Sequence, residues 1–301
     1  MLQFILMKFF LPLTVIFFFI ACQGKSVKSD LDFKEELSKP LNEISGIASD
    51  GDDLWAITDK PKAVVYRVDL KGKVQQEITI KNAKASDVEA VTRDADFVYI
   101  GDVGDNEGNR EERQIIKLAK SGIGKGKETE VDAELITFRF SDETMVDKKK
   151  KNNYDCEALL SYGDSLYLFT KRRTDLQTEL FSLPKTPGKY TARSVGVFNC
   201  NGLITDAAIN ANNNEVALTG YNKGHKYPFI LLLKNFQGCN FFTGESERIE
   251  LTDKPWDWQI ESITYSASNQ VYFACEETKE VKSTLYAIAR NKLNKLNKKR
   301  E

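Results

Sequence analysis

The hydrophobic pattern of residues 31–290 is typical of a succession of short β-strands. Runs of five to eight residues rich in Val, Ile, Phe, Tyr and Thr alternate with clusters of Gly, Asn, Asp and Lys. The 3.6-residue periodicity of amphipathic helices is almost absent from this part of the chain. Because short runs separated by turn residues are the pattern of antiparallel sheets, the sequence predicts an all-β domain.

These runs recur five times in the same order. Each repeat begins with a short strand that has a small residue in its middle, at residues 44–48, 88–92, 156–160, 205–209 and 260–264. A turn and a second strand follow, at residues 54–58, 98–102, 166–170, 216–220 and 271–275. Third strands are expected at residues 64–70, 113–119, 179–184, 228–234 and 284–289. The first four repeats add a fourth strand, at residues 74–80, 134–140, 193–198 and 247–251, which the fifth repeat lacks.

A repeat of four antiparallel strands is typical of a β-propeller, in which each sheet, or blade, contributes its first strand to a central channel. The sequence therefore predicts five four-stranded blades within residues 31–290. The missing outer strand of the last blade is expected at residues 32–38, because an N-terminal strand there would close the ring and cover an open edge. Six blades are the alternative, if residues 119–154 contain further strands.

The N-terminal segment predicts export and lipidation. Residues 9–21 form an apolar stretch that is shorter than the roughly 20 residues of a membrane span and is typical of a secretory signal peptide. The stretch ends in FIAC, which resembles the lipobox of bacterial lipoproteins. We therefore expect a signal peptide at residues 1–21, a lipid on Cys22 and a tether at residues 22–30. An ordinary signal peptide and an uncleaved anchor helix are the alternatives.

Lipidation would place the protein in the bacterial cell envelope, at the periplasmic face or the cell surface. Acyl chains on Cys22 would bind it to membrane lipid without a spanning helix. Lys and Arg number 43 and Asp and Glu 44, so the net charge of −1 argues against a nucleic-acid partner. The single His argues against a His-rich zinc site and a His-dependent triad. Residues 291–301 form a basic polar tail, and we expect a monomer.

Four further cysteines lie in the predicted domain. Cys156 and Cys275 fall inside strand patterns and are interpreted as small buried side chains. Cys200 and Cys239 lie in loop-like contexts, and an exported protein can form disulfides, so these two are the favoured pair if a bridge exists.

The second position of the repeat is acidic in four of five cases. Its residues are Ser45, Glu89, Glu157, Asp206 and Glu261. First strands line the channel of a propeller, so these side chains are expected at equivalent heights around its axis. Carboxylates at this density repel one another unless a cation or a ligand neutralises them. The alternative interpretation is that they accept backbone N–H groups and lock neighbouring blades together.

A second set of polar residues follows the second strands. It comprises Thr58-Asp59, Asp102, Thr170-Lys171, Thr219 and Cys275-Glu276. The second repeat continues with Gly104, Asp105, Asn106 and Arg110, whose oxygen atoms suit a hard cation and equally suit a hydrogen-bonded turn. We expect Asp102, Lys171 and Glu276 at the same channel mouth, and a candidate Ca²⁺ site at Glu89, Asp102, Glu157 and Glu261.

The segments VEAVTRDADFVYIGDVGDN, CEALLSYGDSLYLFTKRR, ITDAAINANNNEVALTGY and IESITYSASNQVYFACEE resemble known bacterial propellers. The relevant groups are the NHL-like, SdiA-regulated-type and phytase-related esterase-like families. The resemblance covers residues 41–290 and implies a secreted or lipid-anchored propeller. Ser45 departs from the acidic motif in the first repeat, as does the long loop after the second.

Three functions are consistent with these observations. The first is a binding module that holds a small anionic ligand, an ion or an envelope protein at the acidic mouth of the channel. The second is a Ca²⁺-dependent hydrolase of phosphate or carboxylic esters, in which Lys171 or Arg110 neutralises the substrate. The third is a scaffold that recruits partners. The sequence identifies no nucleophile.

Overall fold

The computed structural model describes residues 31–141, 152–210, 212, 214–222, 224, 226–251 and 259–295. The expected signal peptide, Cys22 and the tether lie outside these residues, as does most of the basic tail. Within the described ranges, no helix combines the length and the apolar character needed to span a membrane.

The strands follow the predicted repeat closely. The first strands are β2 (Ile44–Asp50), β6 (Val88–Arg93), β11 (Cys156–Tyr162), β15 (Leu203–Asn210) and β19 (Ile260–Tyr265). The second strands are β3 (Asp53–Thr58), β7 (Phe97–Asp102), β12 (Ser165–Thr170), β16 (Glu215–Asn222) and β20 (Gln270–Cys275). The third strands are β4 (Val64–Asp69), β8 (Arg113–Ala119), β13 (Thr178–Pro184), β17 (Lys226–Lys234) and β21 (Thr284–Ala289).

The remaining elements lie at the outer edges of the sheets and in their connections. The fourth strands are β5 (Val74–Ile80), β10 (Glu134–Phe140), β14 (Gly188–Phe198) and β18 (Glu245–Glu250), and the chain adds β1 (Phe33–Glu36) and β9 (Glu128–Val131). The helical elements are η2 (Lys39–Leu41), η3 (Lys120–Gly122), η5 (Phe241–Thr243) and α1 (Arg290–Leu293).

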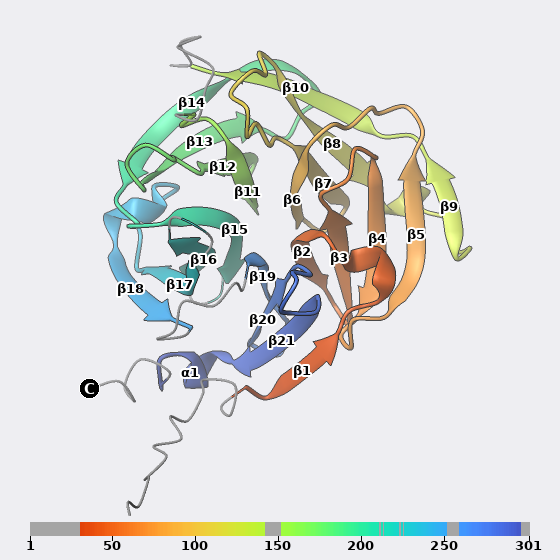
Figure 1. The fold of residues 1–301 in the computed structure, drawn as a ribbon. Helices are drawn as coiled ribbons and strands as arrows, with labels where there is room; N and C mark the ends of the chain where they lie inside the picture. Colours follow the sequence, from red (N-terminus) through yellow and green to blue (C-terminus); the bar gives the residue numbers. More distant parts are fainter. Residues whose placement is uncertain are drawn as a thin grey trace, which may run out of the picture.

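The sheets radiate from a closed ring of first strands. β2 packs beside β6, β6 beside β11, β11 beside β15, β15 beside β19, and β19 again beside β2. Figure 1 shows the other strands of each sheet fanning outward from this ring. Successive strands within a repeat are antiparallel, and β10 joins β14 in parallel, so that two units form one eight-stranded sheet. This arrangement is a β-propeller.

The N-terminal strand takes the position that the fifth repeat leaves open. β1 pairs antiparallel with β21, with Phe33 opposite Ala287 and Glu36 opposite Thr284. The ladder is extended by the Leu37 N–H, which donates to the Ser283 carbonyl at 2.9 Å. Leu37 is itself buried against the neighbouring sheet. The first and last parts of the propeller are therefore held together by backbone hydrogen bonds and by an apolar contact.

The long stretch after the second repeat extends existing sheets. Its described residues form β9, which pairs in parallel with β5, and β10, which pairs with β8. Val131 at the end of β9 is buried in the cluster between the first two units. Because β9 pairs with the outer edge of β5, this edge is closed to pairing with other chains.

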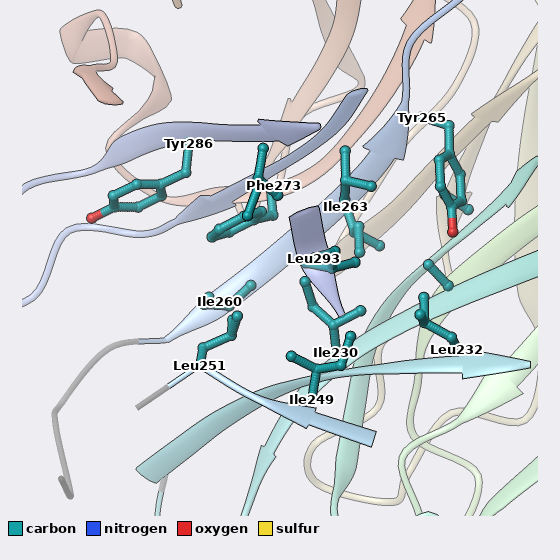
Figure 2. Packing of buried hydrophobic residues seen from close by; sticks show 14 of the residues in the cluster. Ile230, Leu232, Ile249, Leu251, Ile260, Ile263, Tyr265, Phe273, Tyr286 and Leu293 are labelled. Carbon is teal, nitrogen blue, oxygen red and sulfur yellow. The ribbon is translucent and has the colours of Figure 1, made fainter. Parts of the chain in front are cut away.

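Apolar side chains fill the space between neighbouring sheets. Figure 2 shows one such layer, in which Ile230 and Ile249 face Ile263 and Phe273 of the next sheet. The Phe273 ring stacks on Tyr286, with 5.3 Å between ring centroids. Leu293 of α1 adds to this layer. Packing of this kind fixes the relative rotation of the sheets, and therefore the positions of the channel residues.

Cys200 and Cys239, the favoured pair for a possible bridge, form no disulfide in this structure. Cys200 is buried, and its Sγ donates to the carbonyls of Leu176 and Gly202 at 3.3 and 3.2 Å, whereas Cys239 is exposed. The two loop-like contexts looked alike in sequence, but one of these loops folds into the interior.

Removing β1 should destabilise the domain. A chain that begins at Lys39 loses the ladder to β21 and the burial of Leu37, and it exposes the edge of β21. We expect a melting temperature lower by about 5–10 °C and a greater tendency to aggregate. A chain that begins at Leu31 is the control. Equal melting temperatures and solubility would contradict the closing role of β1.

Candidate functional site

A β-bulge at the start of every first strand aims one side chain toward the channel. The pairing between first and second strands shifts at the same point in all five repeats. The residues that stand at the shift are Ser45, Glu89, Glu157, Thr205 and Glu261. A bulge leaves its extra residue outside the ladder and redirects its side chain. Four of these five residues, all but Thr205, line a cavity of about 170 Å³.

The fourth repeat differs by one residue from the alignment expected from sequence. Thr205, rather than Asp206, stands at the bulge, because Ile204 pairs with Gly220 and Asp206 pairs with Thr219. The Thr205 hydroxyl donates to the Ile260 carbonyl at 2.7 Å. The Ser45 hydroxyl does the same toward Val88 at 2.9 Å. Hydroxyl residues at the bulge therefore tie one first strand to the next.

Asp206 is a lock between sheets and does not line the cavity. Its carboxylate accepts from the N–H groups of Ala207 and Ile263, both at 2.8 Å. The residue is fully buried, and burial raises the pKa of its carboxyl group well above the usual range. The interpretation of the acidic positions as inter-blade locks thus fits Asp206, whereas the other three carboxylates face the cavity.

A second ring lies on the second strands, one residue beyond the pair that precedes each bulge. Thr58, Asp102, Thr170, Gly220 and Cys275 belong to these pairs, and the next residues are Asp59, Val103, Lys171, Tyr221 and Glu276. All of the second ring except Val103 line the same cavity. Sequence reasoning found Lys171 and Glu276 but missed Tyr221. Aligning Ile204 with Ile44 and Ile260 would have found it.

Lys171 is a fixed cation at the centre of the site. Its ammonium is buried, forms an ion pair with Glu157 and donates to the Tyr221 hydroxyl at 2.7 Å. Burial lowers the pKa of Lys171, but the negative charges led by Glu157 outweigh this effect, so the pKa is raised. The pKa of Glu157 is raised to about 7 by burial, against the opposing effect of Lys171.

The remaining carboxyl groups of the cavity have raised pKa values. Burial, followed by the charges of Glu157 and Asp59, raises the pKa of Glu89 well above its usual value. Burial likewise raises the pKa of Glu261, and it raises the pKa of Glu276 to about 7. Lys171 and Arg173 are the cations among the described lining residues. The site therefore tends to retain protons that a bound cation would displace.

Asp59 and Glu89 of the cavity lie close enough to Asp87 for the three carboxylates to share an ion. Ligand oxygens of Asp59, Asp87 and Glu89 lie within 4.8 Å of one another. The pKa of Asp87 is raised to about 6 by burial and then by Asp59 and Asp155. Oxygen donors in this arrangement match the preference of Ca²⁺, which also accepts carbonyl and water ligands.

Gly104 allows these carboxylates to converge. A Cβ at this position would lie 2.5 Å from the Asp87 Oδ2 atom and 2.8 Å from the Glu89 Cγ atom. Any larger residue would therefore displace the two acidic side chains. The glycine of the GDVGDN motif thus contributes space rather than a turn conformation, because its φ lies outside the left-handed region.

Asp102 lies away from the cavity and organises the segment before β6. Its carboxylate accepts from the Asp87 N–H at 2.9 Å and from the Gln114 side chain at 2.8 Å, and it forms an ion pair with Arg110 at 3.0 Å. The predicted Ca²⁺ set of Glu89, Asp102, Glu157 and Glu261 is therefore not gathered at one point. Among the described acidic residues, Asp59 and Asp87 join Glu89 instead.

Asp105 and Arg110 stabilise the loop after β7. Asp105 pairs with the buried Arg113 at 2.7 Å and accepts from the Asn109 N–H at 2.9 Å. Arg110 donates to the carbonyls of Gly104 and Asp102 at 2.8 and 3.1 Å. These contacts support the interpretation of the motif as a hydrogen-bonded turn.

Asn106 differs from its neighbours because it reaches the cavity. It accepts a hydrogen bond there from Arg173, which also pairs with the buried Asp155 at 2.5 Å. Arg173 therefore presents a guanidinium at the mouth, and the Asp155 carboxylate partly compensates its charge.

Comparisons with known proteins do not identify a family for this chain. No family model matches the sequence, and no curated protein matches it. The aldose sugar dehydrogenase of Streptomyces coelicolor in its PQQ-bound form is similar at 10% identity and a TM-score of 0.48, over 85% of this chain and 96% of that one. The β-propeller domain of Cps50 (Swd1) from Myceliophteria thermophila has 11% identity and a TM-score of 0.38, over 82% and 83%.

A third similar structure is the exo-β-1,3-galactanase of Phanerochaete chrysosporium with β-1,3-galactotriose. It has 12% identity and a TM-score of 0.49, and the match covers 80% of this chain and 58% of that one. Similarity at this level concerns the overall fold alone. The resemblance to particular bacterial propeller families stays a prediction.

The raised pKa of Glu276 predicts a pH-dependent effect of its removal. A carboxyl with a folded pKa near 7, against 4.5 ordinarily, stabilises the fold fully below pH 4.5 and loses this contribution as the pH rises to about 7. The Glu276→Gln variant has no carboxyl group to lose a proton at this position. Its free energy of unfolding, relative to that of the wild type, should therefore increase between pH 4.5 and 7. Denaturant unfolding across this range measures the effect. The same measurement on Glu280→Gln, an exposed position, serves as the comparison, and a constant difference for Glu276→Gln would contradict the assignment.

Proposed function

We propose that this protein is a lipid-anchored binding module of the bacterial cell envelope, and that it holds a Ca²⁺-class cation, together with a small ligand, at the mouth of its channel. In this proposal the five first strands define five blades, and β1 completes the last one. The convergence of Asp59, Asp87 and Glu89 beside Gly104 carries the proposal. Three oxygen donors leave several positions of a Ca²⁺ shell for water or for a ligand.

The ligand would be small and would carry an anionic or strongly polar group. A cavity of about 170 Å³ is below the roughly 300 Å³ at which pockets for drug-sized ligands begin. A carboxylate or phosphate could complete the cation's coordination shell and at the same time face Arg173 and Tyr221 across the cavity. Without the cation, the surplus of acidic groups would repel such a ligand. Cation and ligand would therefore bind cooperatively.

Calcium titration of the purified protein tests this proposal. We expect the double change Asp87→Asn with Glu89→Gln to weaken Ca²⁺ binding by about 100-fold or more, because it removes two charged ligands. The exposed pair Asp52→Asn with Glu130→Gln removes the same charge elsewhere and should have no effect. Wild-type binding should also be weaker at pH 5.5 than at pH 7.5, since Asp87 must lose its proton. Equal loss in both double variants, or no wild-type binding, would refute the site.

Hydrolysis of phosphate or carboxylic esters is the second candidate. The raised pKa values of Glu261 and Glu276 favour it, because protonated carboxyl groups near a metal-bound water could donate a proton to a leaving group. Lys171 and Tyr221 are unsuited as nucleophiles, since both pKa values are raised and both groups stay protonated. Turnover of an ester panel that is lost on chelation would favour this candidate. Calcium binding without turnover favours the binding module. The absence of both calcium binding and turnover would favour the scaffold.

Membrane attachment is proposed from the FIAC sequence that ends at Cys22. Cys22→Ala should move the protein from the membrane fraction to the soluble fraction and abolish labelling by a fatty-acid analogue. The control Cys239→Ala removes an exposed thiol of the domain and should change neither result. Retention of the label in Cys22→Ala would contradict lipidation at this residue.

A further inference from the structure

A second and larger cavity lies at the opposite end of the β2–β3 hairpin from the channel mouth. Ser45 and Asp59 at one end of this hairpin line the mouth, whereas Asp50 and Asp53 at the other end line a cavity of about 740 Å³. A β-strand rises about 3.3 Å per residue, so the strand residues between the two sites separate them by roughly 15–20 Å. This second cavity, called the groove below, is therefore independent of the proposed Ca²⁺ site.

The wall of the groove is built by the segment that leads into β9. The side-chain amide of Gln76, a buried residue of β5, donates to the carbonyls of Gly124 and Gly126 at 2.6 and 2.7 Å. The Lys127 carbonyl accepts from the Glu77 N–H at 2.8 Å, and β9 then pairs with β5. A buried amide that holds two glycine carbonyls fixes the shape of this wall. The groove is thus a built feature rather than a gap beside a loose loop.

The floor of the groove is polar and carries both acidic and basic side chains. Asp50 accepts from the Trp55 indole N–H at 2.9 Å and pairs with Lys120 at 2.7 Å. These contacts lower the pKa of Asp50 although burial opposes them. On the other side, Arg67 pairs with Asp53 at 2.5 Å. Both acidic groups are therefore neutralised by a cation of the same groove.

Two further cations remain in the groove. Lys125 and Lys127 line it and are exposed, and neither has an ion-pair partner among the described residues. Because the other charges compensate one another, these two lysines give the groove a net positive charge. An anionic ligand would therefore be attracted to the β9 side, while its remaining polar groups would meet the Asp50 and Asp53 carboxylates.

We propose that the groove binds an acidic oligosaccharide of two or three sugar units. Its volume lies within the roughly 300–1,000 Å³ of small-molecule pockets. Sugar hydroxyls can donate to the two aspartates and accept from the Arg67 guanidinium, while a sugar carboxylate pairs with Lys125 or Lys127. Trp55 and Ile123 are the apolar side chains of the lining, and the other lining residues are polar, charged or glycine.

Isothermal titration of the purified protein with trigalacturonate tests this proposal, with neutral galactotriose as the matched ligand. We expect trigalacturonate to bind at least about 10-fold more tightly than galactotriose, with an affinity that falls as salt is added. Lys125→Gln with Lys127→Gln should weaken trigalacturonate binding about 10-fold. The control Lys62→Gln with Lys71→Gln removes two exposed lysines elsewhere and should change it less than 2-fold.

Several results would overturn the proposal. Equal binding of the charged and neutral trisaccharides would remove the role of the anionic group. An equal effect of both lysine pairs would assign the attraction to overall charge. Competition by inorganic phosphate alone at the same concentration would indicate a phosphate site instead. Thermal unfolding of each variant verifies that its fold is intact, and calcium titration of the Lys125/Lys127 variant should be unchanged, which keeps this test separate from that of the channel mouth.

Discussion

The bulge that opens each first strand is the constraint on which the site depends. A regular strand would alternate its side chains between the two faces of a sheet, and those faces are filled by the apolar layers between sheets. The extra residue at the bulge is released from this alternation and turns toward the channel. Repetition of the bulge in all five repeats therefore creates a polar ring without interrupting the core. The ring of Asp59, Lys171, Tyr221 and Glu276 follows from the same register.

Charge in so confined a ring has to be compensated, and the repeats do this in different ways. Ser45 and Thr205 replace the carboxylate by a hydroxyl that bonds to the next strand. Glu157 is compensated by Lys171. Among the described residues, Glu89 and Glu261 form no ion pair comparable to that of Glu157, and burial raises their pKa values. Stability alone would favour neutral side chains at both positions, so their acidity is a reason for the cation proposed at the mouth.

The sequence predicted the strands better than it predicted the site. Alternation and turn residues located nearly every strand, and the fifth repeat's missing strand pointed to β1. A bulge has no such signature, and a shift of one residue changes which side chain faces the channel. Asp206 was therefore assigned to the ring in place of Thr205, and Tyr221 was missed. Asp87 precedes its strand, so only the folded chain brings it beside Asp59.

The differences between the repeats make the charge distribution of the channel mouth asymmetric. Asp59, Asp87 and Glu89 come from the first two repeats, whereas Lys171, Arg173 and Tyr221 come from the third and fourth. One side of the cavity therefore attracts cations, and the other presents fixed donors whose charges are largely satisfied. A perfectly symmetric ring of five carboxylates would hold an ion on its axis with no preferred orientation for anything beyond it. In the second ring, the third and fourth repeats carry Lys171 and Tyr221 in place of an acidic residue, which in the proposed function would give a ligand bound to the ion one orientation.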